Sequence, residues 1–204
     1  MVVNTIQEEA INTLLIPIEE LPPGSLGAIR RQVTESLINT VATQLKVSPD
    51  TLIARDIRPY TDLMWGTNSD FTGSAISTDI WNVTQVSSTG AFFDIVVDTS
   101  TTMADRRWVA IYGIRDMRTC FATRVIQAIT LFKITVGNST KAIWDTTKLA
   151  AYKLNPVGVS ASAVIIPQNT QYQFSGYCVG SATTVCWISL EGVVVEPRGK
   201  VISP

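Results

Sequence analysis

Apolar and polar positions follow two different periods along the 204-residue chain, and the period changes near residues 59–78. Between Gly24 and Lys46, apolar residues recur every three or four positions and line one helical face: Leu26, Ile29, Val33, Leu37, Val41 and Leu45. The residues Pro22-Pro23-Gly24-Ser25 supply a start signal, and Val47-Ser48-Pro49-Asp50 supply a stop signal. This pattern predicts one long helix.

A weaker helical pattern precedes it, from Thr5 to Leu15, and ends ahead of Pro17. Its apolar side is formed by Ile6, Ala10, Ile11 and Leu14. The two helices predict an N-terminal helical arm over residues 1–58. Residues 59–78 contain Pro59, Gly66 and Asn68 and are interpreted as a turn-rich junction.

From about Thr78 onward, short runs rich in Val, Ile, Thr and aromatic residues alternate with Gly, Ser, Asn and Pro clusters. The runs predict eight strands at residues 79–86, 92–98, 107–114, 125–136, 141–146, 161–166, 171–179 and 185–195. So many strands leave no room for crossover helices, which favours an antiparallel sandwich or barrel, with a jelly roll as the commonest eight-stranded arrangement. The predicted fold class is α+β, mainly β: a helical arm followed by an eight-stranded, jelly-roll-like β-sandwich over residues 79–204.

The chain is poor in charge and lacks histidine. Charged residues make up 16% of the sequence, where about 25% is usual, and the net charge is −1. A nucleic-acid-binding protein normally carries a basic excess, and the arginines at 55, 58, 106 and 107 are interleaved with acids, which indicates local ion pairs. The absence of histidine excludes Ser-His-Asp, Cys-His and zinc-histidine chemistry within the chain.

The first ten residues include Glu8 and Glu9 and lack the basic and apolar regions of a signal peptide. No apolar run reaches the length that crosses a bilayer. The three cysteines, Cys120, Cys178 and Cys186, form no CxxC pair and favour free thiols, with a Cys178–Cys186 disulfide across a hairpin as the alternative. We therefore expect synthesis in a cytoplasm and no membrane partner.

No candidate chemistry is specific. Acids in or beside the predicted strands offer material for a glycosidase, which needs two facing carboxylates: Asp94, Asp98, Asp105, Asp116, Asp145 and Glu191. Their spacing selects no pair, and no phosphate-binding or calcium loop is present. We predict no catalytic residue, cofactor or metal. The five tryptophans are interpreted as core or interface residues, with a sugar-stacking platform as the alternative.

An apolar stretch joins the two predicted helices and suits an extended contact with a partner subunit. With one aromatic residue of the junction, it supplies the candidate partner-binding residues Leu14, Leu15, Ile16, Ile18, Leu21 and Trp65. The alternative is that this stretch packs over one edge of the β domain. Low charge and mean hydropathy of +0.22 favour a protein that packs against neighbours.

The layout resembles jelly-roll virion proteins of tailed bacteriophages, especially capsid cement (decoration) proteins. The resemblance covers residues 79–196 and rests on the helical arm, the Ser/Thr-rich strands, the predicted hairpin over residues 132–145 and the closing strand over residues 190–196. It transfers no functional residue.

This resemblance implies a non-enzymatic virion protein, made in the host cytoplasm, that bridges neighbouring subunits of an icosahedral head. The implied partners are the major capsid protein or other virion proteins and further copies of the chain, with a trimer favoured. We expect neither nucleic acid nor membrane as a partner. The alternatives are a tail or baseplate component, a receptor- or glycan-binding component, and a jelly-roll shell subunit.

Overall fold

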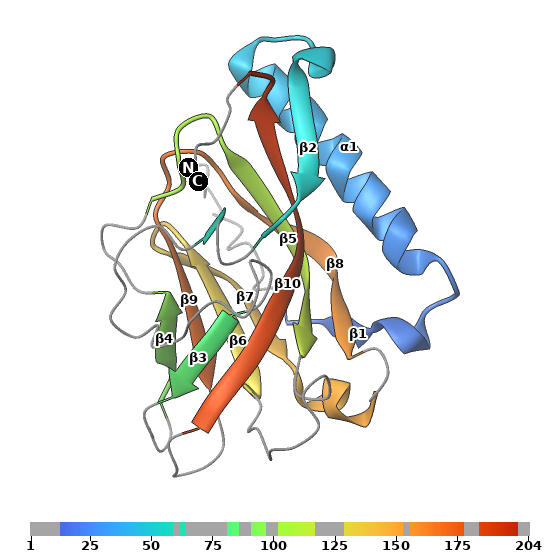
Figure 1. Cartoon of the computed structure of the whole chain (residues 1–204), viewed down its shortest axis with the longest axis vertical. Helices are drawn as coiled ribbons and strands as arrows, with labels where there is room; N and C mark the ends of the chain where they lie inside the picture. Colours follow the sequence, from blue (N-terminus) through green and yellow to red (C-terminus); the bar gives the residue numbers. More distant parts are fainter. Residues whose placement is uncertain are drawn as a thin grey trace, which may run out of the picture.

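The computed structural model describes residues 13–58, 62–63, 81–85, 91–96, 102–116, 129–152, 156–177 and 184–199. Within these ranges, a long helix packs on one of two antiparallel sheets, and the sheets face each other as a β-sandwich (Figure 1). The helix is α1 (Ser25–Leu45), and short 3₁₀ turns lie at Ile18–Glu20, Pro49–Thr51 and Thr147–Ala151. The strands are β1 (Leu15–Pro17), β2 (Leu52–Asp56), β3 (Trp81–Gln85), β4 (Phe93–Val96), β5 (Trp108–Asp116), β6 (Leu131–Val136), β7 (Ser139–Asp145), β8 (Val157–Ile166), β9 (Tyr172–Tyr177) and β10 (Thr184–Pro197).

The larger sheet has the order β1-β8-β5-β10-β2, and β3 also pairs with β10. The long strand β10 has room for both partners on one side, because residues 193–197 pair with β2 and residues 184–188 pair with β3. The smaller sheet has the order β4-β9-β6-β7. All of these pairs are antiparallel.

The eight strands from β3 to β10 form a jelly roll. The first half of this segment is matched by the second half running back, because β3 pairs with β10, β4 with β9, β5 with β8 and β6 with β7. These pairs alternate between the sheets: β3–β10 and β5–β8 belong to the larger sheet, and β4–β9 and β6–β7 belong to the smaller one. This alternation is the arrangement of two Greek keys in a jelly roll. Each of the eight predicted strands overlaps one of these strands, so the predicted fold class is confirmed.

The predicted long helix is confirmed to within one residue at each end. Its apolar face lies on the larger sheet, with Leu37 and Val41 buried. Gln44 fixes the last turn, because its side-chain oxygen accepts a hydrogen bond of 2.9 Å from Nε1 of the buried Trp108 on β5. The helix thus covers the outer face of the larger sheet (Figure 1).

The predicted first helix is wrong at its C-terminal end. Leu15 lies in β1, paired with Ser160 of β8, and is 7% exposed. Ile16 precedes a proline, which favours extended backbone. Gly158 makes room for the strand, because a Cβ atom there would lie 2.6 Å from Cγ of Leu15. Residues 5–12 of that helix lie outside the described residues.

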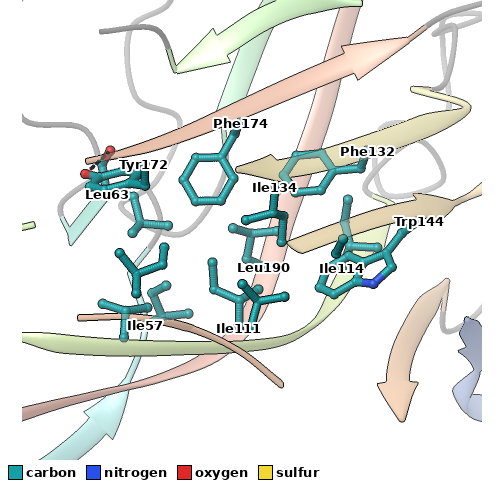
Figure 2. Packing of buried hydrophobic residues seen from close by; sticks show 14 of the residues in the cluster. Ile57, Leu63, Ile111, Ile114, Phe132, Ile134, Trp144, Tyr172, Phe174 and Leu190 are labelled. Carbon is teal, nitrogen blue, oxygen red and sulfur yellow. Dashed lines mark hydrogen bonds between the residues drawn. The ribbon is translucent and has the colours of Figure 1, made fainter. Parts of the chain in front are cut away.

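The core between the sheets is built from aromatic and branched side chains (Figure 2). Phe132 stacks between two rings, with centroids 5.8 Å from Phe174 and 6.2 Å from Trp144. The predicted hairpin over residues 132–145 is confirmed as β6 and β7, and Gly137 takes φ = 59° at its turn. A second cluster fills the space between α1 and the larger sheet.

The predicted hairpin between the two C-terminal cysteines is not formed. β9 belongs to the smaller sheet and β10 to the larger one, so the connection between them crosses the sandwich. Cys178 lies outside the described residues, and Cys186 lies in β10, with its side chain outside the description.

Candidate interaction site

A groove of about 390 Å³ lies between α1 and the edge of the larger sheet. We call it the α1–β8 groove. Its walls come from the segment around β1, one side of α1, the middle of β5 and most of β8: Ile16, Leu21, Ile29, Gln32, Val33, Ser36, Leu37, Ala110, Tyr112, Val159, Ser160, Ala161, Ser162, Ala163 and Ile165. None of these residues is charged. The groove arises because the β8 residues in its wall are mostly serine and alanine, whose small side chains leave space beside α1.

A bulge in the ladder between β5 and β8 lies at this groove. Ile111 pairs with Val164 and Gly113 pairs with Val159, so Tyr112 and residues 160–163 fall outside the β5–β8 pairing. Gly113 is suited to this place, because a Cβ atom there would lie 2.4 Å from the carbonyl oxygen of Gly158. Bulges of this kind are common beside functional sites, where they redirect side chains.

Tyr112 is the larger of two buried hydroxyl-bearing side chains in the groove wall, and Ser160 is the other. Tyr112 is 2% exposed, and no described residue forms a hydrogen bond with its hydroxyl group. Burial raises the pKa of Tyr112, and the negative charge of Glu191 raises it further. The hydroxyl group therefore keeps its proton at neutral pH and remains a donor.

The structure places two of the six candidate partner-binding residues in the wall of this groove. Ile16 and Leu21 line it, and Ile18 packs against the cluster beneath α1. Leu15 is buried in the core, whereas Leu14 is 55% exposed. The alternative interpretation, packing over an edge of the β domain, therefore holds for β1. Trp65 lies outside the described residues, and a partner at Leu14 stays a prediction.

Four charged residues form an ion network at one end of the sandwich: Asp62, Arg107 and Glu196, which are buried, and Arg55, which is partly exposed. Both guanidinium nitrogens of Arg55 lie 2.7 Å from the Asp62 oxygens, and Arg107 Nε lies 2.9 Å from Glu196 Oε1. A contact of 3.2 Å between Arg55 and Glu196 links the two pairs. The hydrogen bond to Asp62 is the main cause that raises the pKa of Arg55.

This network corrects the expected local pairing of the arginines. Arg106 does lie beside Asp105, at 3.8 Å, and Arg55 pairs with Asp62 seven residues away, but both Arg55 and Arg107 also contact Glu196, which is distant in sequence. Glu196 is 141 residues from Arg55. Sequence reasoning missed the network, although an acid in a strand that is otherwise apolar, Val193-Val194-Val195-Glu196, was the one available signal.

The candidate glycosidase acids are held separately among the described side chains. Asp94 accepts hydrogen bonds from Gln173 and Ser175, Asp145 accepts from Thr147, and Glu191 contacts Arg115. Asp105 accepts a hydrogen bond from Asn169. Asp98 and the side chain of Asp116 lie outside the description. No contact joins two of the described acids.

Two of the five tryptophans lie in the core, and the side chains of the other three lie outside the described residues. Trp108 and Trp144 are 1% and 0% exposed, which confirms the core interpretation for these two. Nothing is described of Trp65 or of the side chains of Trp81 and Trp187. The alternative, a sugar-stacking platform of tryptophans, is supported by neither of these two residues.

A different aromatic patch lies on the smaller sheet. The rings of Phe92 and Tyr177 have centroids 5.8 Å apart, and Lys133 Nζ lies 4.6 Å from the Phe92 centroid. Lys133 and Tyr177 alternate along β6 and β9 with residues that are buried in the core, so they point to the outer face. We call Phe92, Lys133 and Tyr177 the outer patch.

Within the described ranges, no group of three or more His, Cys, Asp or Glu residues is placed to hold a metal ion. None of the described helices has the length and apolar character needed to cross a membrane. No protein-family model, curated protein or solved structure matches this chain.

Proposed function

We propose that the protein is a non-enzymatic structural component of a virion, of the capsid cement or decoration type, which stabilises a head by bridging neighbouring capsid subunits. Jelly rolls occur in viral capsid proteins and lectins, but a fold serves many functions. The proposal therefore depends on the surface that this jelly roll presents.

The observation that carries the proposal is an uncharged apolar edge, formed by residues 13–18 and β8. Neither segment contains a charged residue, while Leu14 and Ile165 are 55% and 39% exposed. Soluble proteins usually protect a sheet edge with lysine, proline or a cover, because an open edge pairs with other chains. Here the groove-side edge has Pro17 and the bulge but no charge, which favours burial against a partner.

The mechanism is the burial of surface across subunit junctions. Each Å² of apolar area removed from water contributes roughly 25 cal/mol before the costs of ordering are subtracted. Many copies on one head add these contributions. The ion network serves the same role within the chain, because it ties β2 and the start of β5 to β10.

Add-back of purified protein to heads prepared without it tests this proposal. Leu14→Lys places a charge on the uncharged edge, so we expect less co-sedimentation with the heads. Val47→Lys is the matched control, because Val47 is 40% exposed but lies after α1, away from the groove. Equal co-sedimentation of both variants with the parent protein would refute the role of this edge.

Truncation of the arm is a poorer test. Removing residues 1–23 would delete β1 and expose the core that Leu15 covers, so loss of attachment would not separate binding from folding. Single substitutions at exposed positions avoid this difficulty.

A glycan-binding virion component is the second candidate, and the outer patch is the observation that favours it. Aromatic rings beside polar groups suit sugar stacking, and Asp94 lies on the neighbouring strand β4. This candidate predicts that immobilised glycans retain the parent protein and that Tyr177→Ala abolishes the retention. Absence of retention on a broad glycan array would exclude it.

A further inference from the structure

The α1–β8 groove has the properties of a small-molecule site rather than of an ordinary packing defect. Its volume of about 390 Å³ lies within the usual range of roughly 300–1,000 Å³ for ligand pockets. Such pockets are mostly apolar and contain a few polar groups that orient the ligand. The groove combines the apolar side chains of Ile29, Val33 and Ile165 with two buried residues that carry a hydroxyl group, Tyr112 and Ser160.

Two further observations point to a ligand. The hydroxyl group of Tyr112 has no hydrogen-bond partner among the described residues, and its oxygen is not one of the fully buried unpaired atoms, so it remains accessible to a small molecule. The bulge also takes Tyr112 out of the β5–β8 ladder, at the place where the groove opens. Together, these observations show a hydrogen-bond donor, the Tyr112 hydroxyl group, beside the apolar groove.

The charge of the lining restricts the class of ligand. Every lining residue is uncharged, so a carboxylate, phosphate or ammonium group would lose its hydration without gaining a counter-ion. The charges that act on Tyr112 lie outside the lining and are already paired, Arg30 with Asp56 and Arg115 with Glu191. An uncharged molecule avoids this cost.

We propose that the α1–β8 groove binds a small uncharged amphipathic molecule, with an apolar body between α1 and β8 and an oxygen acceptor that takes a hydrogen bond from Tyr112. The proposal does not depend on the proposed virion role, because the groove is present in a single chain. Its experiments use the purified protein alone, so its failure would leave the head-binding test unaffected.

A pair of matched fluorescent probes tests the site. N-phenylnaphthylamine is uncharged, and anilinonaphthalene sulfonate carries a sulfonate on a similar ring system. We expect the uncharged probe to bind at least about tenfold more tightly, because the lining offers no counter-ion. Equal affinity for the two probes, or no binding of the uncharged probe, would overturn the proposal.

Two helix variants locate the bound probe. Val33→Trp fills the groove and is expected to abolish binding, whereas Ile38→Trp is the control, because Ile38 packs beneath α1 but does not line the groove. Circular dichroism and denaturation midpoints of both variants check that each is folded. Equal loss in both variants, or retained binding in Val33→Trp, would place the probe elsewhere and overturn the proposal.

The role of Tyr112 is tested by competition. An aliphatic ketone should displace the probe about fivefold better than the hydrocarbon of equal length, because one hydrogen bond contributes about 1 kcal/mol. Tyr112→Phe should bind the probe and lose this preference. A preference that survives in Tyr112→Phe would overturn the assigned hydrogen bond. If the groove instead binds an apolar side chain of a partner protein, neither the ketone nor the hydrocarbon should displace the probe. That result would also overturn the proposal.

Discussion

Replacing Arg107 by leucine tests whether Arg107 is buried and coupled to the acids of the ion network as the structure shows. Arg107 is 3% exposed and contacts two carboxylates, Glu196 at 2.9 Å and Asp62 at 3.6 Å. Leucine retains part of the apolar stem but leaves one guanidinium, that of Arg55, for two buried acids. The variant therefore contains an uncompensated negative charge, shared by Asp62 and Glu196, whose side chains are 1% and 8% exposed.

The expected loss of stability follows from this geometry. Removing one partner of a buried ion pair usually costs about 3–5 kcal/mol. Asp62 keeps both short contacts with Arg55, and Glu196 keeps one at 3.2 Å. We therefore expect a decrease near the lower end, about 3 kcal/mol.

Urea denaturation followed by circular dichroism measures this loss as a shift of the midpoint. Arg106→Leu is the control at the neighbouring position, because the Arg106 side chain is 65% exposed and its contact with Asp105 is 3.8 Å. An exposed pair of this kind contributes at most about 1 kcal/mol. The double variant Arg107→Leu/Glu196→Leu should regain part of the lost stability, since it removes the orphaned acid. A loss below about 1 kcal/mol in Arg107→Leu would refute the reasoning.

Three other perturbations have defined outcomes. Gly158→Ala should lower the free energy of unfolding by about 1–3 kcal/mol, because its Cβ atom would overlap β1, whereas Gly27→Ala, with open space in α1, should raise it by up to about 1 kcal/mol; thermal denaturation measures both. The pKa of Tyr112 is raised in the folded state, so the folded protein keeps this proton where the unfolded chain loses it. The hydroxyl group therefore contributes its full stabilisation below about pH 10, and this contribution decreases as the pH rises above that value. In Tyr112→Phe, the urea midpoint should decrease less between about pH 9 and 11 than in the parent protein. Trp144→Phe should cost about 1 kcal/mol less than Trp108→Phe in the same assay, because the Trp144 indole N–H has no partner in the described structure, whereas Trp108 loses its bond to α1.

Local periodicity was sufficient for most of the fold. The helix α1 could be predicted because its apolar positions repeat over 21 residues, and the strands could be predicted because turn residues separate them regularly. β1 could not, because three residues are too few for a period and its extended form depends on Gly158 across the strand pair. β2 was also missed, since Arg55 and Asp56 hide its apolar residues.

The candidate site depends on contacts that local patterns do not contain. Ile16 and Leu21 were identified from an apolar stretch, and they do line the groove. The bulge that removes Tyr112 from the ladder arises from the register between β5 and β8, which lie far apart in the sequence. The contacts of Glu196 with Arg55 and Arg107 could not be predicted either, because they too depend on which strands pair. Side-chain pattern predicts which residues are buried, but not which distant residues meet.

The composition of purified virus particles tests the central claim most directly. Particles from host cells that carry the gene should contain the chain in many copies by quantitative mass spectrometry. Antibodies against the purified protein should then label the heads in electron micrographs. Particles that lack the chain while the infected cells contain it would contradict a structural role in the virion.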